Sequence, residues 1–453
     1  MSHGKRQLIV ILLVAIFAIV APTVLLFASG YSYNWHKHRI EKTGILYINA
    51  EPATAEVYVN GKKIRGSIPV SVPRLLPEDY LIEVRLSEYF PWSKTLTIKS
   101  GQTTFAKTIT LIRNVLPRLD WRAEVTNSTF SANASAVAYI ATNESWSELF
   151  HYDLKTKQTL LLARFGQDKY SKLDLHISPN GSRILLSAID AITRERIVII
   201  YKAELGSTAV ELKELARLSA VRWSWSVDSS ILALLGPTGL IFVDNDQTVR
   251  RQPLALNAVR DLMFGNRSLW LLSETVNSLK LFQASLAGQD ALEIQIALPT
   301  KNYRFVSGND RLLWLNDSGN KKGLAIRIDD LSWRQTSEIQ DIRWEQTGDN
   351  GRLLLWNDFE IFLFDPNKSD EPSLITRLGT PINDVAWHPA GTYALFTTAT
   401  GVTAIELDGR DHRNIVRLVE FGSVDSVTIN AEEKLLYFIG SVGNQRGLYE
   451  RPL

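Results

Sequence analysis

Histidine, the side chain best suited to acid–base and metal chemistry near neutral pH, is rare in this chain, and its copies are scattered. It has seven histidines and no cysteine in 453 residues. Without cysteine there are no disulfides, thiolate metal sites or cysteine nucleophiles. The histidines are His3, His36, His38, His151, His176, His388 and His412. His176 and His388 lie in short turn-like motifs at different offsets, so we expect them to serve the turns, and we expect no metal site and no cofactor.

Motifs for catalysis are also missing from the sequence. There is no G-x-S-x-G nucleophile elbow, no H-E-x-x-H zinc motif and no G-x-x-x-x-G-K phosphate loop. The acidic stretches Asp244-Asn245-Asp246 and Asp365–Glu371 lack the alternation and glycine of a calcium loop, which favours solvated turns. The sequence therefore predicts no catalytic residue and a protein that is not an enzyme.

Aromatic side chains are the remaining candidates for binding. The tryptophans in the openings of a repeat described below, Trp225, Trp344 and Trp387, occupy equivalent places, which indicates packing between the repeats. Trp223, Trp270 and Trp314 lie close to such openings. Trp333 and Trp356 fit the repeat less well and are predicted at the surface. Tyr89, Phe90 and Trp92, beside Pro91 at an expected strand end, complete the candidate binding residues.

The cellular location of the protein is indicated by the uncharged apolar run Leu8–Phe27. About 20 apolar residues in a helix cross a bilayer. A cleaved signal peptide is the alternative, supported by Lys5-Arg6 and by Ala28-Ser29-Gly30, but its apolar core is usually about 7–15 residues. The sequence favours a tail (1–7), a retained transmembrane anchor (8–28) and a juxtamembrane segment (29–42), with the rest of the chain outside the cytoplasm.

Net charge and chain length limit the functions and the number of domains that the protein can have. Fifty basic and 48 acidic residues give a net charge of +2, which offers no electrostatic attraction for nucleic acid. A chain of 453 residues has room for two or three domains.

Residues 43–112 show the alternation of short strands. Asn60-Gly61 between two such runs predicts a hairpin. Six or seven strands in about 70 residues, with no helical period, predict a small antiparallel β-sandwich. In such a thin sandwich, alternating aromatic residues are expected to fill the core.

An ordered series of short motifs runs through this segment: Glu51–Val57, Val59–Lys62, Ser67–Val70, Leu76–Val84 and Glu88–Trp92. The series resembles the PEGA domain of bacterial surface and envelope proteins. The family's Pro-Glu-Gly turn reads Pro77-Glu78-Asp79 here, followed by Tyr80, and we expect Asp79 to adopt the left-handed conformation at some cost. The resemblance implies a surface module without catalytic residues.

After a linker (113–118), residues 119–453 repeat a short unit in which an apolar or aromatic residue and a turn precede an apolar strand. The copies begin at Phe130, Ile177, Trp225, Phe264, Phe305, Trp344, Trp387 and Ile429. Their spacing of 39–48 residues matches one propeller blade. The pattern resembles the WD-repeat-like, Tol-type propellers of bacterial envelope proteins. We predict an all-β chain with eight blades, or seven if the copy at Phe264 or Phe305 belongs to a neighbour.

The last repeat has too few residues for a fourth strand. A propeller must close its ring or leave an edge exposed. Asp120–Val125, just ahead of the first repeat, is predicted to supply the missing strand.

Together these features predict a non-catalytic, single-pass membrane protein of the cell envelope that binds or scaffolds a protein or glycan partner. The alternative is a propeller hydrolase or lyase acting on envelope polysaccharide, with axial residues gathered from several blades. A third hypothesis, a cytoplasm-facing assembly platform, differs only in topology.

Overall fold

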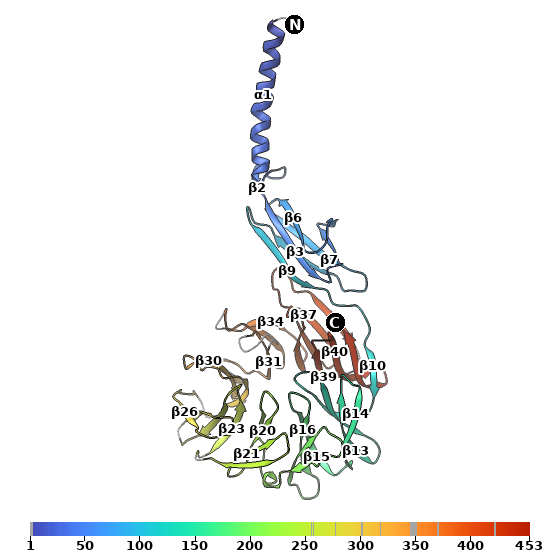
Figure 1. Cartoon of the computed structure of the whole chain (residues 1–453), viewed down its shortest axis with the longest axis vertical. Coiled ribbons are helices and arrows are strands. Elements are labelled where there is room, and N and C mark those ends of the chain that lie inside the picture. The colour runs from blue at the N-terminus through green and yellow to red at the C-terminus, as the bar shows by residue number, and fades with distance from the viewer. Residues whose placement is uncertain are drawn as a thin grey trace. The chain divides into compact units, whose positions relative to one another are not determined.

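The computed structural model describes residues 3–254, 256, 258–276, 278–299, 302–317, 319–344, 351–368, 371–420 and 423–453, and only the backbone of residues 3–9 and 344. The Trp344 side chain and the turn after it, and Ser369 and Asp370 of the second acidic stretch, lie outside this description. Helix α1 (His3–Ala28) is followed by strands (Figure 1). The all-β prediction with one N-terminal helix is confirmed.

Helix α1 contains the apolar run, with Pro22 inside it. Its part Val10–Ala28 has a mean hydropathy of 3.0, and none of it is buried in the structure. The Thr23 hydroxyl donates to the Ile19 carbonyl at 2.7 Å, so this polar group has a partner inside the helix. The helix is long and apolar enough to cross a membrane, and a signal sequence shares these properties.

The chain divides into two compact units, of which the first contains residues 1–115 together with residues 405–416 and the second the remainder. The expected domain boundaries assigned residues 405–416 to the propeller. In the structure this segment packs with the sandwich, because side chains of both satisfy each other's polar groups, as described below.

A hairpin follows α1 where the sequence predicts only a juxtamembrane segment. Its strands are β1 (Tyr31–Asn34) and β2 (Arg39–Lys42). Asn34 is fully buried, and its Oδ1 accepts the backbone N–H groups of His36 and Lys37 at 3.0 and 3.1 Å. Its Nδ2 donates to Glu41 at 2.7 Å and to Glu78 at 2.8 Å. One amide therefore both closes the turn and links the hairpin to the sandwich.

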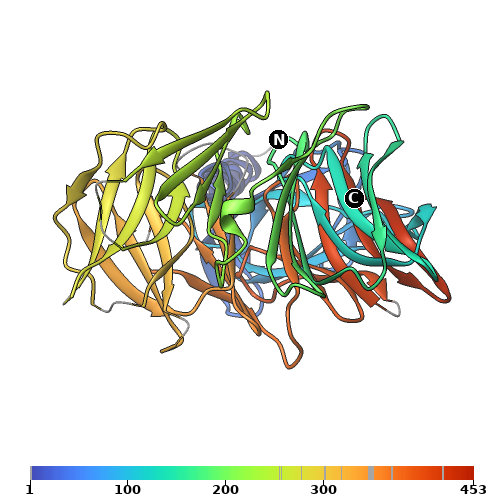
Figure 2. The ribbon, with the colours of Figure 1, turned by 90° about the horizontal axis from the view of Figure 1, so that it is seen from below.

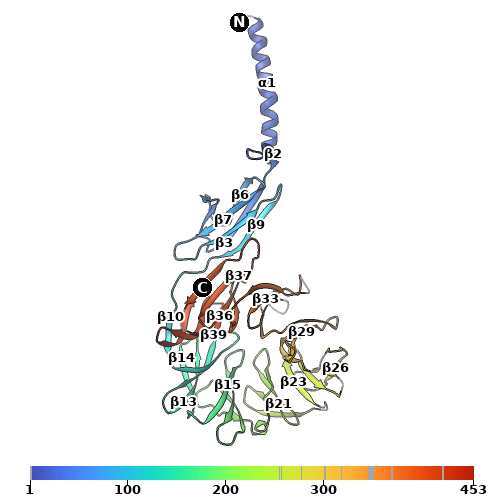
Figure 3. The same cartoon turned by 180° about the vertical axis from the view of Figure 1, so that it is seen from behind.

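Residues 44–110 form seven strands, which agrees with the prediction. They are β3 (Gly44–Glu51), β4 (Glu56–Val59), β5 (Lys62–Lys63), β6 (Val70–Leu75), β7 (Asp79–Arg85), β8 (Trp92–Thr97) and β9 (Thr103–Thr110). They make two sheets, ordered β6-β3-β9 and β5-β4-β7-β8 (Figure 3). One pair departs from the expected antiparallel arrangement. β3 and β9 run parallel, because the chain crosses to the second sheet between them.

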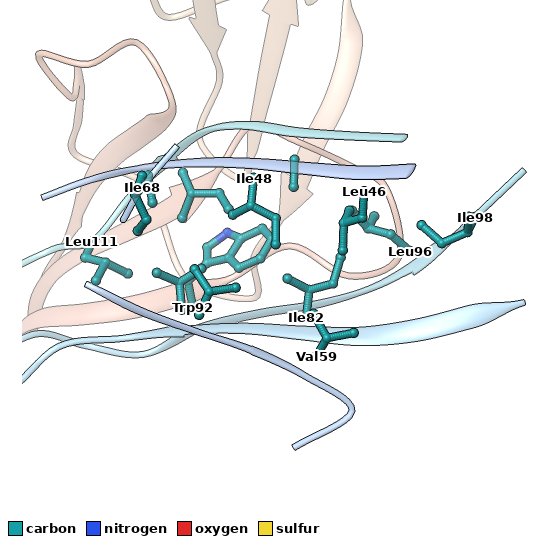
Figure 4. Close-up of a cluster of buried hydrophobic side chains, with 14 residues drawn as sticks. Leu46, Ile48, Val59, Ile68, Ile82, Trp92, Leu96, Ile98 and Leu111 are labelled. Atoms are coloured by element: carbon teal, nitrogen blue, oxygen red, sulfur yellow. The ribbon is translucent and has the colours of Figure 1, made fainter. Parts of the chain in front are cut away.

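The sandwich core comes from alternating positions of these strands. Strand β3 alternates between buried and more exposed residues along its whole length. Leu46, Ile48, Ile82 and Trp92 meet between the sheets and are at most 3% exposed (Figure 4). Burial of each such aliphatic side chain stabilises the fold by about 1.5–3 kcal/mol.

The second unit contains eight four-stranded sheets among the described residues, which confirms the higher predicted blade number. The first strands are β11 (Val125–Phe130), β15 (Tyr170–Ile177), β19 (Trp223–Trp225), β23 (Val259–Phe264), β27 (Arg304–Gly308), β31 (Asp341–Trp344), β35 (Asp384–Trp387) and β39 (Ser423–Asn430). The second strands are β12 (Ala136–Thr142), β16 (Arg183–Asp190), β20 (Ile231–Leu235), β24 (Leu269–Glu274), β28 (Leu312–Asp317), β32 (Leu353–Trp356), β36 (Tyr393–Thr398) and β40 (Leu435–Val442).

The outer half of each sheet is built from its third and fourth strands. The third strands are β13 (Trp146–Asp153), β17 (Arg196–Lys202), β21 (Gly239–Asp244), β25 (Leu279–Ala284), β29 (Lys322–Arg327), β33 (Glu360–Phe364), β37 (Gly401–Glu406) and β41 (Gln445–Pro452). The fourth are β14 (Gln158–Gly166), β18 (Val210–Glu211), β22 (Val249–Pro253), β26 (Leu292–Ile294), β30 (Ser332–Ser337), β34 (Ser373–Arg377), β38 (Ile415–Glu420) and β10 (Arg118–Arg122). Figure 2 shows these sheets from below.

The repeated turn between first and second strands explains the sequence motif. Ser131, Ser178 and Ser226 each accept, on Oγ, the backbone N–H of the first residue of the next strand, at 2.9–3.0 Å. His388 stands in this place in the seventh sheet, and its Nδ1 accepts the Ala390 N–H at 3.1 Å. The predicted turn role of His388 is confirmed.

The predicted closing strand is present as β10, which begins two residues before the expected Asp120. It pairs antiparallel with β41, so the first strand of this unit completes the last sheet. Lys157 ties the closure to the first sheet through Asp120 at 3.0 Å and Glu450 at 2.8 Å, and Arg118 also pairs with Glu450. Buried side chains such as Tyr139 of the first sheet and Tyr437 of the eighth pack in one cluster.

We predict that Glu450→Gln destabilises this closure by about 1–2 kcal/mol at pH 7, a value between those of an exposed ion pair and of a buried hydrogen bond to a charged group. Burial raises the pKa of Glu450, but the Lys157 and Arg118 donors outweigh it and hold the pKa below the ordinary 4.5. A depressed carboxyl pKa gives stability that is lost as the pH falls below the ordinary value. In thermal unfolding, the difference between wild type and variant should therefore shrink at acidic pH.

Glu420→Gln serves as the matched control, because its partner Arg417 and Glu420 itself are 74% and 64% exposed. This variant should match the wild type at every pH. Equal melting temperatures for Glu450→Gln and wild type at pH 7 would contradict a stabilising role for the closure.

Candidate binding site on the propeller axis

A cavity of about 640 Å³ lies where the first strands of the propeller sheets converge. Its wall includes residues from the first, second, third, sixth, seventh and eighth sheets. The turns that open the sequence repeats form part of this lining, among them Phe130, Trp387 and Ile429. The repeat that is visible in the sequence therefore also places equivalent turns around one axial space.

Two charged groups on the cavity wall, Arg343 and Asp384, form a chain of ion pairs with Asp341. Arg343 donates through Nη1 to Asp341 Oδ2 at 2.7 Å and through Nη2 to Asp384 Oδ1 at 3.2 Å. Asp384 also accepts the backbone N–H groups of Val385 at 2.8 Å and of Val427 in the next sheet at 3.4 Å. These bonds join the sixth, seventh and eighth sheets.

Burial and the neighbouring charges act in opposite directions on the pKa values of Asp384 and Arg343. Burial raises the pKa of Asp384, and Arg343 offsets part of this rise. Burial lowers the pKa of Arg343, but Asp341 and Asp384 outweigh it and raise the pKa above its usual range. With both carboxylates ionised, the group carries a net charge of −1.

Trp387 is held at the cavity by polar contacts on two sides. Its indole N–H donates to the Arg343 carbonyl at 2.8 Å, and the Arg352 guanidinium lies 5.1 Å from the ring centroid. Trp225, in the third sheet, has an equivalent partner in Arg183, at 4.8 Å. Both rings line the cavity while a cation from the neighbouring sheet fixes them.

This arrangement suits recognition of a ligand with apolar parts and hydrogen-bond donors. The rings of Phe130, Trp225 and Trp387 provide apolar surface, and the Asp384 carboxylate is a hydrogen-bond acceptor. The net charge of the ion-paired group favours a ligand that is neutral or positively charged at that point.

The predicted aromatic candidates of the sandwich lie at its core or its end. Trp92 is 3% exposed, and its indole N–H donates to Glu406 at 2.9 Å. Tyr89 and Phe90 are half-buried; the Tyr89 hydroxyl accepts from Arg113 Nε at 3.1 Å. The Trp92 ring offers no surface to a ligand.

The two candidate binding residues of the propeller, Trp333 and Trp356, differ in exposure. Trp356 is 2% exposed, so the prediction that it lies at the surface is wrong; it follows the buried Leu353–Leu355 in the second strand of its sheet. Trp333 is 42% exposed on β30, an outer strand. Neither residue lines the axial cavity.

The turn Pro77-Glu78-Asp79-Tyr80 contributes hydrogen bonds to the sandwich. Glu78 accepts from Asn34, and Asp79 begins β7 and accepts the Thr97 hydroxyl on its carboxylate at 2.5 Å. Asp79 is not among the residues with positive φ, so the expected left-handed conformation is wrong. The strand pairing of β7 with β8 starts at Asp79 and keeps its backbone extended.

The remaining histidine and acidic candidates do not converge. His176 lies on β15 rather than in the turn, with Nε2 2.9 Å from Asp174 Oδ2 and its ring against Trp223. Asp244 accepts backbone N–H groups of its own turn. In the part of the chain that the structure describes, no group of three or more His, Asp or Glu side chains could hold a metal ion.

The sequence did contain a signal for the residues that it missed. Asp261, Asp341 and Asp384 each stand three positions before the aromatic residue of a repeat opening. Asp261 repeats the role of Asp384, because it accepts the N–H of Leu262 and that of Phe305 in the next sheet. A recurring acid ahead of the aromatic position thus marks a link between neighbouring sheets.

Comparison with known proteins supports both modules. Residues 43–111 match the family model of the PEGA domain. Among solved structures, the chain is similar to a eukaryotic initiation factor, with 12% identity and a TM-score of 0.50 over 76% of this chain and 95% of that chain. It is also similar to the Dos1 propeller (15%, 0.49, 74% and 94%) and to the C-terminal WD40 domain of Sif2 (13%, 0.45, 75% and 99%). The first likeness shows the fold alone. No curated protein matches the chain.

We predict that Arg343→Met destabilises the propeller by about 2 kcal/mol at pH 8. Removing one partner of a buried ion pair costs about 3–5 kcal/mol, and the Arg343 side chain is 44% exposed to the cavity, which reduces the loss. Without the cation the pKa of Asp384 rises further, so protonation relieves the loss as the pH falls. Unfolding followed by tryptophan fluorescence at pH 8 and pH 5 measures both effects.

The double variant Arg343→Met/Asp384→Asn should recover part of the lost stability, since no unpaired carboxylate then remains at Asp384. Arg334→Met is the control, because its partner Glu371 is 71% exposed. A pH-independent loss in Arg343→Met would contradict the role assigned to Asp384.

Proposed function

We propose that the protein is a membrane-tethered, non-catalytic binding protein that takes a segment of a protein or glycan partner into the axial cavity of its propeller. The observation that carries this proposal is the cavity itself, which six of the eight sheets enclose. Its volume of about 640 Å³ falls within the range of about 300–1,000 Å³ typical of ligand sites.

The chemistry of the wall supports binding over bond cleavage. A hydrolase or lyase needs a carboxylate or imidazole able to exchange a proton with its substrate. Asp341 and Asp384 both bind Arg343, and each also accepts a backbone N–H, from Ile342 and Val385 respectively. The acids nearest the cavity therefore hold the sheets together, and we assign them no catalytic role.

The tether is α1, and we place the units that follow it outside the cytoplasm, in the cell envelope. The apolar segment of α1 suits a single span, and residues 43–111 belong to a domain type of extracellular proteins. Tyr31 and Tyr33, directly after α1, are partly exposed, as expected of aromatic residues at a membrane interface.

We predict that Ala386→Trp fills the cavity and reduces partner recovery at least tenfold. Ala386 lines the cavity, and its neighbour Val385 is fully buried, so the added ring projects into the axial space rather than into the packing between sheets. The measurement is chemical crosslinking of the full-length chain in native membranes, followed by mass spectrometry of the partners recovered.

Ala220→Trp is the matched control, since Ala220 is exposed and lies outside the cavity lining. This variant should recover the same partner in the same yield as the wild type. Undiminished recovery with Ala386→Trp, given a folded protein, would place the partner site elsewhere.

A second prediction concerns topology. We place the propeller on the extracytoplasmic side of the membrane. A tag after Leu453 should therefore be removed when protease is added to intact spheroplasts or to other cells without an outer barrier. A cytoplasmic control protein must stay intact in the same sample. If the tag is cleaved only after lysis, the propeller faces the cytoplasm and its partner must be a cytoplasmic one.

A further inference from the structure

The outer edge of strand β8 is covered by side chains of residues 405–416, which belong to the same compact unit. Strand β8 is last in the sheet β5-β4-β7-β8, so among the described strands none pairs with its outer backbone groups. Asn414 takes that place at Ser93, with Oδ1 accepting the Ser93 N–H at 3.3 Å and Nδ2 donating to its carbonyl at 3.1 Å. Asp411 Oδ2 accepts the Thr95 N–H at 2.7 Å. Two side chains thus imitate a paired strand.

Between these two contacts, Lys94 extends into the segment and is fully buried. Its Nζ donates to the backbone carbonyls of Asp408 and Arg410 at 2.8 Å each, and to that of His412. An ammonium group has three protons to donate, and the three carbonyls use all of them. Because each acceptor is a backbone carbonyl, the contact requires the curved path of the segment rather than particular side chains.

Glu406 balances the buried charge. Its Oε2 lies 3.2 Å from Lys94 Nζ and accepts Asn414 Nδ2 at 2.8 Å, and its Oε1 accepts the Trp92 indole N–H at 2.9 Å. A buried charge is tolerated when it is paired and fully hydrogen-bonded, and both charges meet this condition here.

We propose that the outer edge of β8, with Lys94 at its centre, is a peptide-binding site of the sandwich, and that the chain's own segment 405–416 is its ligand. The site recognises a short loop that presents three convergent carbonyls, one acid for Lys94 and Trp92, and Asp or Asn side chains spaced to cap the strand edge. This inference is independent of the axial cavity and of the function proposed for it.

The bound segment contains two arginines that report on its release. Arg410 donates to the Phe105 carbonyl at 2.7 Å, and Arg413 to the Glu406 carbonyl at 3.0 Å. While the segment is bound, the peptide bonds after these residues are held in a fixed loop and resist trypsin. Release makes both bonds accessible.

The test compares limited trypsin digestion of the full-length wild type with that of Lys94→Met. Methionine keeps an unbranched apolar side chain but removes the donor for three carbonyls, so cleavage after Arg410 and Arg413 should become at least tenfold faster. Amide hydrogen exchange at Ser93 and Thr95 should accelerate as well. Lys99→Met, at an exposed lysine of the same sandwich, should behave as the wild type. Equal cleavage in Lys94→Met and wild type would overturn the proposal.

A second variant separates release from misfolding. Asp411→Ala/Asn414→Ala leaves Lys94 and the sandwich core unchanged and removes the strand caps, together with the hydrogen bond from Asn414 to Glu406. Exchange in the central strand β7 should stay slow while Thr95 becomes exposed. A synthetic peptide of residues 404–417, added in excess to this variant, should restore the protection of Thr95. Failure of the peptide to do so, with β7 still protected, would show that the edge is no peptide site and would leave the axial cavity untouched.

Discussion

Backbone groups at the edge of a β-sheet must find partners, and this requirement governs both units of the protein. An open edge invites pairing with other chains. The propeller satisfies its last edge with β10, a strand taken from the start of its own sequence. The sandwich satisfies the edge of β8 without a strand, through the side chains of Asn414 and Asp411. In both cases the completing residues come from a distant part of the chain.

Cations placed against backbone carbonyls are the second recurring device. Arg183 is almost fully buried, and its guanidinium donates to the carbonyls of Val243 and Asp244 while it lies over Trp225. Lys94 has a similar environment in the sandwich. Such contacts are compatible with many different side chains on the neighbouring segment, because the acceptors are backbone carbonyls. They also make the residue hard to replace, since its loss leaves several carbonyls without a donor.

The sequence predicted the architecture because the relevant signals are local. Alternation and the Asn60-Gly61 turn identified the sandwich strands, and the regular spacing of the repeat openings identified the blades. The short last repeat even indicated the closing strand. These features depend on residues within one hairpin or one repeat, where periodicity reports directly on burial.

The features that the sequence did not predict depend on contacts between residues that are far apart in the sequence. Nothing near Lys94 indicates a partner more than three hundred positions away. Likewise, the parallel pairing of β3 with β9 and the burial of Trp356 follow from how sheets stack. The ion pairs around Arg343 join three sheets, and the Asp three positions before three of the aromatic openings was a signal for them. The sequence therefore predicted the propeller that carries the candidate site, but neither the axial cavity nor its chemistry.

The closure by β10 also imposes an order on biosynthesis. Ribosomes deliver the chain from its amino terminus, so β10 leaves the exit tunnel more than three hundred residues before its partner β41. The same delay applies to β8 and residues 405–416. Throughout that interval two strand edges are present with nothing to pair with, and chains carrying such edges are prone to misassembly. We therefore expect the nascent protein to need a holding factor on the side of the membrane where it folds, until the last fifty residues have been delivered.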